Sequence, residues 1–79
     1  MSVFDAVPVV KMRTDFARRL RAARTRKGYS QPDVMNKAGV DQSQLSRYEN
    51  GHVTPSLEVF VTLCRVYDAR PDVLLGFDD

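Results

Sequence analysis

The sequence contains a single cysteine, Cys64, and a single histidine, His52. A lone cysteine excludes a disulfide bond within the chain, and the two residues together are too few for a structural zinc site. No apolar run approaches the roughly 20 residues that a membrane-spanning helix needs. The first ten residues contain an acid, no basic cluster and no long apolar core. They therefore do not resemble a signal peptide, and we expect a cytoplasmic protein.

The residues that catalysis commonly requires are equally sparse. His52 has no cysteine at helical spacing from it, and the chain contains no glycine-rich loop of the kind that holds phosphate groups. Ser43 and Ser46 have no candidate base nearby in the sequence. We therefore expect a protein that is not an enzyme and that uses neither a metal ion nor an organic cofactor. We also expect Cys64 in the core and His52 in an exposed loop.

Charge is unevenly distributed along the 79 residues, although the net charge is only +2. Residues 11–27 carry eight basic side chains and a single acid, Asp15, whereas acids outnumber basic residues from Tyr48 onward. A basic run of this kind is either a solvated helix face or a surface that faces nucleic-acid phosphates, and charge alone favours the two equally. The basic residues are Lys11, Arg13, Arg18, Arg19, Arg21, Arg24, Arg26 and Lys27.

The N-terminal part of the chain divides into an arm and a helix. Residues 1–13 are expected to form an extended arm, because Pro8 fixes its own φ and disfavours helix at the residue before it. A domain is expected over residues 14–79, beginning with a helix that Thr14 caps and that Gly28 ends. The apolar stripe of this helix is Phe16, Leu20 and Ala23.

Capping patterns predict two short helices after Gly28. Ser30 and Asp33 have the spacing of a capping box, with Asp33 in place of the usual glutamate. Asp41 and Gln44 repeat this spacing at the start of the next helix. Each helix is followed by a glycine that can end it.

Two further helices are expected toward the C-terminus. The first begins near residues 54–56, and Thr54 as the cap with Pro55 as the first helical residue fits best. The second is opened by Pro71 and ended by Gly76. Five short helices without a convincing strand predict an all-α domain.

The spacing of the second and third helices predicts a helix-turn-helix over residues 31–50. Only residues 39–41 separate them, so they must cross at a steep angle. In the third helix, residues 42–50, Leu45 and Tyr48 lie three apart and point inward. The opposite face carries an amide, two hydroxyls and a guanidinium, which are groups that read base edges in a major groove. That face consists of Gln42, Ser43, Ser46 and Arg47.

The run GYSQPDVMNKAGVDQSQLSRYENG, residues 28–51, resembles the phage-repressor-like, or XRE-type, family of helix-turn-helix transcriptional regulators. Residues 54–58 resemble the family's entry to its fourth helix, and residues 71–75 its fifth. The resemblance implies a compact five-helix, lambda-repressor-like domain that binds double-stranded DNA. Met35 departs from the pattern, because the family has a small alanine where the helices cross. Asp68 and Arg70 stand where a glycine and a capping serine are common.

The resemblance also implies roles for individual residues. Gln31 would contact a phosphate and brace Gln42, and Arg24 would form an ion pair with Glu49 while lying near a phosphate. The residues implied to contact bases are Gln42, Ser43 and Arg47. Those implied to contact the DNA backbone are Gln31, Arg24, Gln44, Ser46 and Asn50.

The function expected from these features is that of a homodimeric repressor that binds a pseudo-palindromic operator, of the phage, plasmid or restriction–modification controller type. The alternative is an antitoxin or adaptor whose main partner is another protein, such as a toxin, with DNA binding secondary. An adaptor would tend to carry apolar residues on the third helix face, which has none. Phe4 is either a packing residue or a dimer contact. The expected dimer interface is Leu74, Leu75 and Phe77.

Overall fold

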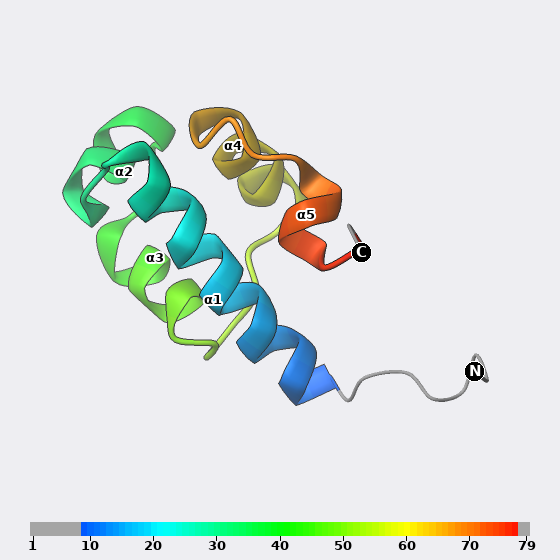
Figure 1. The fold of residues 1–79 in the computed structure, drawn as a ribbon. Helices are drawn as coiled ribbons and strands as arrows, with labels where there is room; N and C mark the ends of the chain where they lie inside the picture. Colours follow the sequence, from blue (N-terminus) through cyan, green and yellow to red (C-terminus); the bar gives the residue numbers. More distant parts are fainter. Residues whose placement is uncertain (1–8, 78–79) are drawn as a thin grey trace.

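The computed structural model describes residues 9–77, which fold into five helices (Figure 1). No strand occurs in this part of the chain, and the predicted all-α fold is confirmed. None of the helices within 9–77 has the length and apolar character needed to cross a membrane. The helices are α1 (Val9–Lys27), α2 (Gln31–Ala38), α3 (Gln42–Glu49), α4 (Leu57–Val66) and α5 (Pro71–Leu75).

Helix α1 begins at Val9, so the prediction that residues 9–13 belong to an extended arm is wrong. Thr14 is not a cap: its hydroxyl donates to the Val10 carbonyl at 2.9 Å, as in a helix interior. Asp15 pairs with Lys11 one turn earlier at 3.3 Å. Such contacts outweigh the weak helix propensity of the β-branched residues in this first turn. The rest of the predicted arm, residues 1–8, lies outside the described residues.

The predicted capping box of α2 is confirmed, and Asp41 is confirmed as the cap of α3, although within the described residues the Gln44 side chain makes no return bond to it. Ser30 Oγ accepts from the Asp33 backbone N–H at 3.1 Å, and the Asp33 carboxylate accepts from the Ser30 N–H at 2.8 Å. Gly39 ends α2 with φ +70°, a left-handed conformation that favours glycine. Asp41 then caps α3, because its carboxylate accepts from the backbone N–H of Gln44 at 3.4 Å. The turn between the helices is therefore fixed at both ends.

Helix α4 starts later than the favoured assignment. Its cap is Ser56, whose Oγ accepts from the Val59 N–H at 3.2 Å, rather than Thr54. Helix α5 has the predicted bounds, although its cap, Arg70, makes no capping hydrogen bond. Asp68 adopts φ +52° in the turn before α5, where the related family often has glycine.

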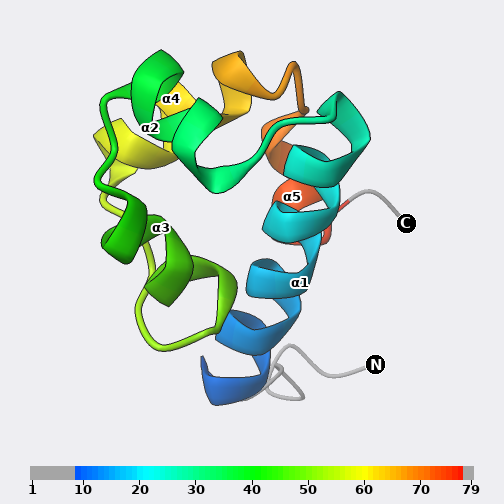
Figure 2. The ribbon, with the colours of Figure 1, turned by 90° about the vertical axis from the view of Figure 1, so that its left-hand side faces the viewer.

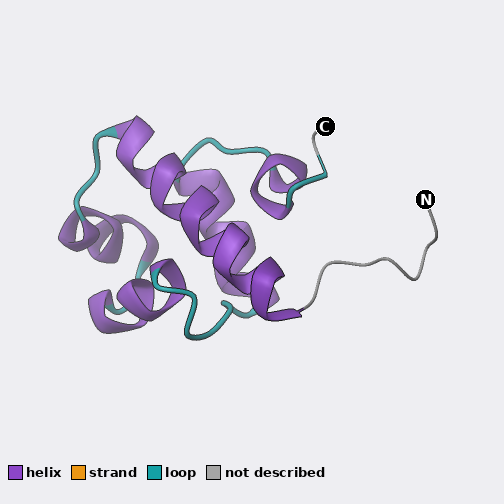
Figure 3. Ribbon diagram, turned by 60° about the horizontal axis from the view of Figure 1, so that its bottom comes forward, coloured by secondary structure: helices purple, strands orange, loops and turns teal. Residues whose placement is uncertain are grey.

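The core lies where α1 crosses the other helices. Helix α1 packs against α3 and α5, and α2 packs against α3 and α4 (Figures 1 and 3). Cys64 is buried, as predicted. Met35 is on the surface of α2, so the helix crossing accommodates it by leaving its side chain partly in solvent. The largest fully buried side chains are Leu20, Val34, Leu45, Leu63 and Leu74.

Candidate nucleic-acid interface

One face of α3 is exposed to solvent, on the side of the molecule formed by α2 and α3 (Figure 2). Leu45 and Tyr48 anchor the opposite face in the core, as the spacing predicted. The helix is therefore held by its apolar side and presents its polar side outward. The exposed residues of that side are Gln42, Ser43, Gln44 and Arg47, with Ser46 half-buried between them.

The exposed groups of α3 differ in how free they are to bind. The Ser43 hydroxyl donates to the Asp41 carboxylate. This bond, followed by the backbone N–H of Gln44, holds the pKa of Asp41 below its usual value. Ser43 consequently presents an acceptor lone pair outward, whereas no hydrogen bond within residues 9–77 engages the Arg47 guanidinium.

Glu49 is the centre of a buried polar cluster at the end of α3. Its side chain is 0% exposed, and Arg24 is 16% exposed. Arg24 binds both carboxylate oxygens, from Nε to Oε2 at 2.7 Å and from Nη2 to Oε1 at 2.9 Å. Its Nη1 also donates to the Tyr29 carbonyl at 2.9 Å. The bond to Glu49 raises the pKa of Arg24, and the two residues join α1 to α3.

Gln31 also joins this cluster. Its Nε2 donates to Glu49 Oε1 at 3.1 Å, so its bond goes to Glu49 and not to Gln42, contrary to expectation. Glu49, in the last turn of α3, therefore connects three helices. Its carboxylate binds Arg24 near the end of α1 and Gln31 at the start of α2. This explains an acid at the edge of a basic surface, because its charge is neutralised locally.

Two arginines beside the helix-turn-helix were not singled out from the sequence. Arg21 donates from Nη2 to Asn50 Oδ1 at 3.4 Å and lies 3.6 Å from Glu49. Arg13 donates from Nη1 to the carbonyl of exposed His52 at 3.3 Å. Arg21 precedes Arg24, the expected partner of Glu49, by three residues and so lies on the same face of the helix. This spacing could have placed Arg21 near Glu49 from the sequence alone.

The basic run of α1 divides between different faces. Arg18 and Lys11 pair with Asp15, and the Arg19 guanidinium lies against Gly76 on the α5 side. The residues of the run that contact α3 or the turn that follows it are Arg13, Arg21 and Arg24. Asn50 donates to Ser46 Oγ at 3.3 Å, which places both next to Arg21. Residues 9–77 contain no group of three histidine, cysteine or acidic side chains arranged to hold a metal ion.

Helix α3 exposes a polar face, is held against α1 and α2 by the Glu49 cluster, and lies beside several arginines. This arrangement is that of a DNA-binding helix-turn-helix regulator. The chain belongs to the helix-turn-helix domain family, whose model matches residues 15–75. The resemblance inferred from residues 28–51 is thereby confirmed.

Named relatives agree with this class. The chain is 32% identical over 62 residues to the HTH-type transcriptional regulator ImmR of Bacillus subtilis (strain 168), a match that covers 78% of this chain and 49% of ImmR. This chain thus spans about half the length of that relative. It is 34% identical over 61 residues to an uncharacterized HTH-type transcriptional regulator of Archaeoglobus fulgidus, covering 77% of this chain and 87% of the relative.

The fold is also similar to a solved structure. The crystal structure of the restriction-modification controller protein C.AhdI from Aeromonas hydrophila superposes with a TM-score of 0.72 and 34% sequence identity. The match covers 77% of this chain and 92% of that chain, so nearly the whole of the controller protein has a counterpart here.

Proposed function

We propose that this chain is a homodimeric repressor that binds a pseudo-palindromic operator, with α3 of each copy in the major groove. The observation that carries the proposal is the exposed polar face of α3, held rigid by the Glu49 cluster. The named relatives are regulators, and the likeness to a controller protein favours the phage-repressor or restriction–modification controller type. The proposed role is therefore binding rather than catalysis.

Base recognition is assigned to Gln42, Ser43 and Arg47. A glutamine can bond bidentately to adenine, and the fork of an arginine matches O6 and N7 of guanine. The Ser43 hydroxyl proton is engaged by Asp41. Ser43 should therefore accept from an exocyclic amino group, as on adenine or cytosine, rather than donate.

Backbone contacts are assigned to residues around α3. Arg24 keeps two of its five N–H groups outside the three bonds it makes to Glu49 and Tyr29, so it can still reach a phosphate. The two arginines found in the structure, Arg13 and Arg21, are added to the proposed phosphate-facing group. The other members are Gln31, Gln44, Ser46 and Asn50.

A dimer is proposed because two half-sites about one DNA turn apart require two copies of α3. Of the three expected interface residues, Leu74 is only 2% exposed and belongs to the core. That part of the prediction is wrong, since a buried side chain cannot face a partner. Leu75 and Phe77 are 49% and 74% exposed and remain available. Phe4 lies outside the described residues.

The rival function is an antitoxin or adaptor that binds mainly another protein, such as a toxin. It would need apolar anchors on the exposed face of α3. The side chains on that face are an amide, hydroxyls and a guanidinium, which favours DNA.

Selection of bound duplexes from a random pool tests the proposed function. We expect enrichment of a pseudo-palindrome whose half-sites are about 10 base pairs apart, centre to centre. The matched control is the same selection with Arg47→Ala, which should lose the preference at one base pair of each half-site. A wild-type pool that remains random after selection would refute sequence-specific binding.

A further inference from the structure

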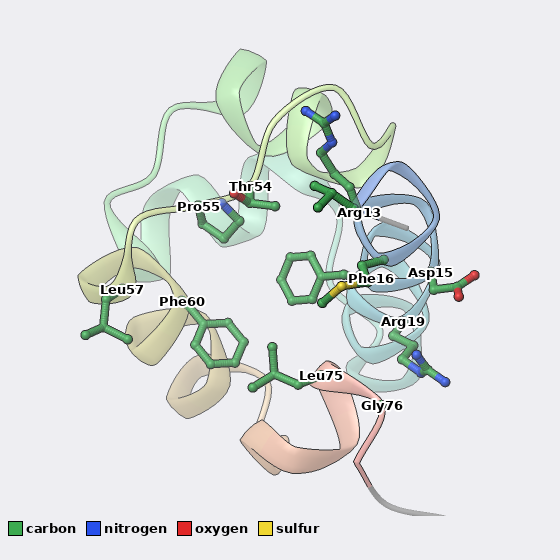
Figure 4. Close-up of a pocket in the computed structure, with 12 residues that line it drawn as sticks. Arg13, Asp15, Phe16, Arg19, Thr54, Pro55, Leu57, Phe60, Leu75 and Gly76 are labelled. Carbon is green, nitrogen blue, oxygen red and sulfur yellow. The ribbon is translucent and has the colours of Figure 1, made fainter. Parts of the chain in front are cut away.

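Most of the exposed large apolar side chains in the described residues lie outside the helix-turn-helix. Several of them line a groove of about 750 Å³ between α1, the loop before α4 and the end of α5 (Figure 4). Leu75 points into this groove and is already assigned to the proposed dimer. Within residues 31–50, Met35 is the only large apolar side chain that is exposed, at 37%. Met35 is thus the one large apolar group among the exposed polar side chains of the helix-turn-helix.

The position of Met35 follows from the contacts at the two ends of α2. At the start of α2, the Gln31 side chain donates to Glu49, the last residue of α3, at 3.1 Å. At the end of α2, only residues 39–41 separate it from the start of α3. Met35 follows Gln31 by four residues, so it lies on the same face of α2, one turn further along. The Met35 side chain is therefore on the face of α2 that meets α3.

The edge of α3 that meets this face carries Gln42 and Ser46. These two residues precede Glu49 by seven and three positions, so all three lie along one side of the helix. Ser46 is half-buried, and its Oγ accepts from Asn50 at 3.3 Å, whereas Gln42 is exposed. Because α2 and α3 lie on one side of the molecule (Figure 2), Met35 and Gln42 border the same stretch of exposed surface.

Met35 has a chemistry that the exposed face of α3 lacks. An amide, hydroxyls and a guanidinium read hydrogen-bonding groups, but the major groove also displays one apolar group, the C5-methyl of thymine. Methionine is unbranched and has a polarisable thioether, so it adapts to an irregular apolar neighbour. Contact between Met35 and a methyl group would remove both from water, which is favourable.

We propose that Met35 contacts the C5-methyl group of a thymine in each half-site, at the base pair that Gln42 reads or the one next to it. An adenine bonded by Gln42 pairs with a thymine whose methyl group lies in the same groove. The inference rests on the proposed sequence-specific binding and adds an apolar specificity residue from α2 to the polar residues of α3. The small alanine that is usual in the related family ends at Cβ, so this departure from the family pattern gives the chain a longer reach.

Replacement of thymine by uracil removes only the C5-methyl group and tests the proposal. Each thymine of the selected operator is replaced by uracil, one position at a time in both half-sites, and the dissociation constants of wild type and Met35→Ala are measured. We expect one position at which uracil weakens wild-type binding by about 15-fold, which is about four-fold for each of two methyl groups removed from water. Met35→Ala should bind the thymine and uracil duplexes of that position equally.

Two variants serve as matched controls. Met35→Leu keeps a long apolar side chain and should retain most of the preference for thymine over uracil. Asn36→Ala changes the neighbouring exposed residue, which is turned about 100° around the helix from Met35, and should retain all of it. Because alanine is the best helix former, Met35→Ala should fold, and circular dichroism melts of all three variants check this.

The outcomes separate this inference from the proposed function. If wild type selects an operator but no uracil replacement distinguishes it from Met35→Ala, the Met35 assignment fails and sequence-specific binding stands. Equal loss of the preference in Met35→Ala and Asn36→Ala would also overturn the assignment, because the effect would then not depend on the Met35 side chain. If wild type selects no operator, the proposed function fails and the assignment fails with it.

Discussion

Replacement of Glu49 by alanine should be among the most damaging single changes in this domain. Glu49 accepts three hydrogen bonds, two from Arg24 and one from Gln31, and is fully buried. Without Glu49, the Arg24 guanidinium, which is 16% exposed, has no counter-charge. Breaking a buried pair in this way costs about 3–5 kcal/mol. Because Arg24 keeps its bond to the Tyr29 carbonyl, we expect the lower end, about 3 kcal/mol.

Thermal unfolding followed by circular dichroism measures this effect. For a domain of this size about 3 kcal/mol corresponds to a fall in Tm of roughly 12–24 °C. Arg21→Ala is the matched control, because Arg21 also approaches Glu49, at 3.6 Å, but is 54% exposed. Screening by solvent should limit its effect to less than about 1 kcal/mol. The reasoning fails if Glu49→Ala melts with wild type, or if Arg21→Ala costs as much as Glu49→Ala.

Three further outcomes are expected. Gln31→Ala should weaken binding to operator and random duplex by similar factors, since Gln31 is held by Glu49 and meets the sugar-phosphate strand; a selective loss on the operator would show that it reads sequence. Three phosphate-facing arginines per copy would neutralise about six phosphates per dimer, so a plot of log K against log salt concentration should have a slope near −5. A slope near zero in a binding titration would rule out this phosphate-facing surface. The hydrogen bonds from Ser30 lower the pKa of Asp33, and those from Ser43 and Gln44 lower the pKa of Asp41. Both carboxylates therefore stabilise the fold at pH values above their ordinary pKa of 3.8, and this stabilisation is lost as the pH falls through their lowered pKa values in the folded state. Tm should stay constant from about pH 7 to pH 5 and drop below about pH 4, and a Tm that rises below pH 4 would contradict this prediction.

Local signals made the centre of the domain predictable from the sequence. The capping box of Ser30 and Asp33 involves residues three apart, and the left-handed turn at Gly39 needs only its own missing side chain. Leu45 and Tyr48 follow helical spacing within one short helix. Because such interactions form between residues a few positions apart, the second and third helices and the exposed face of the third helix could be predicted from the sequence.

Interactions between distant residues were not predictable in the same way. Gln31 and Glu49 are 18 positions apart, and no pattern in the sequence says that their side chains meet rather than Gln31 and Gln42. Helix α5 has five residues, too few for periodicity to show that Leu74 faces the core and Leu75 the solvent.

The start of α1 shows how local propensity is overridden. The residue types around Pro8 favour extended backbone, and Thr14 is a good cap in isolation. The helix nevertheless runs from Val9 through Thr14, where Arg13 reaches the His52 carbonyl at 3.3 Å and Gly51 lies against the Thr14 backbone. These tertiary contacts, which join residues about 40 positions apart, are absent from any local reading of the sequence.

The central claim is that the exposed face of α3 reads DNA sequence, and Arg47 tests it most directly. The measurement is competitive equilibrium binding of wild type and Arg47→Ala to the selected operator, to each single-base variant of it and to random duplex. We expect Arg47→Ala to lose about 1–3 kcal/mol on the operator and far less on random duplex, with relaxed preference at one base pair per half-site. Equal weakening on every duplex would contradict the claim, because Arg47 would then hold a phosphate and read no base.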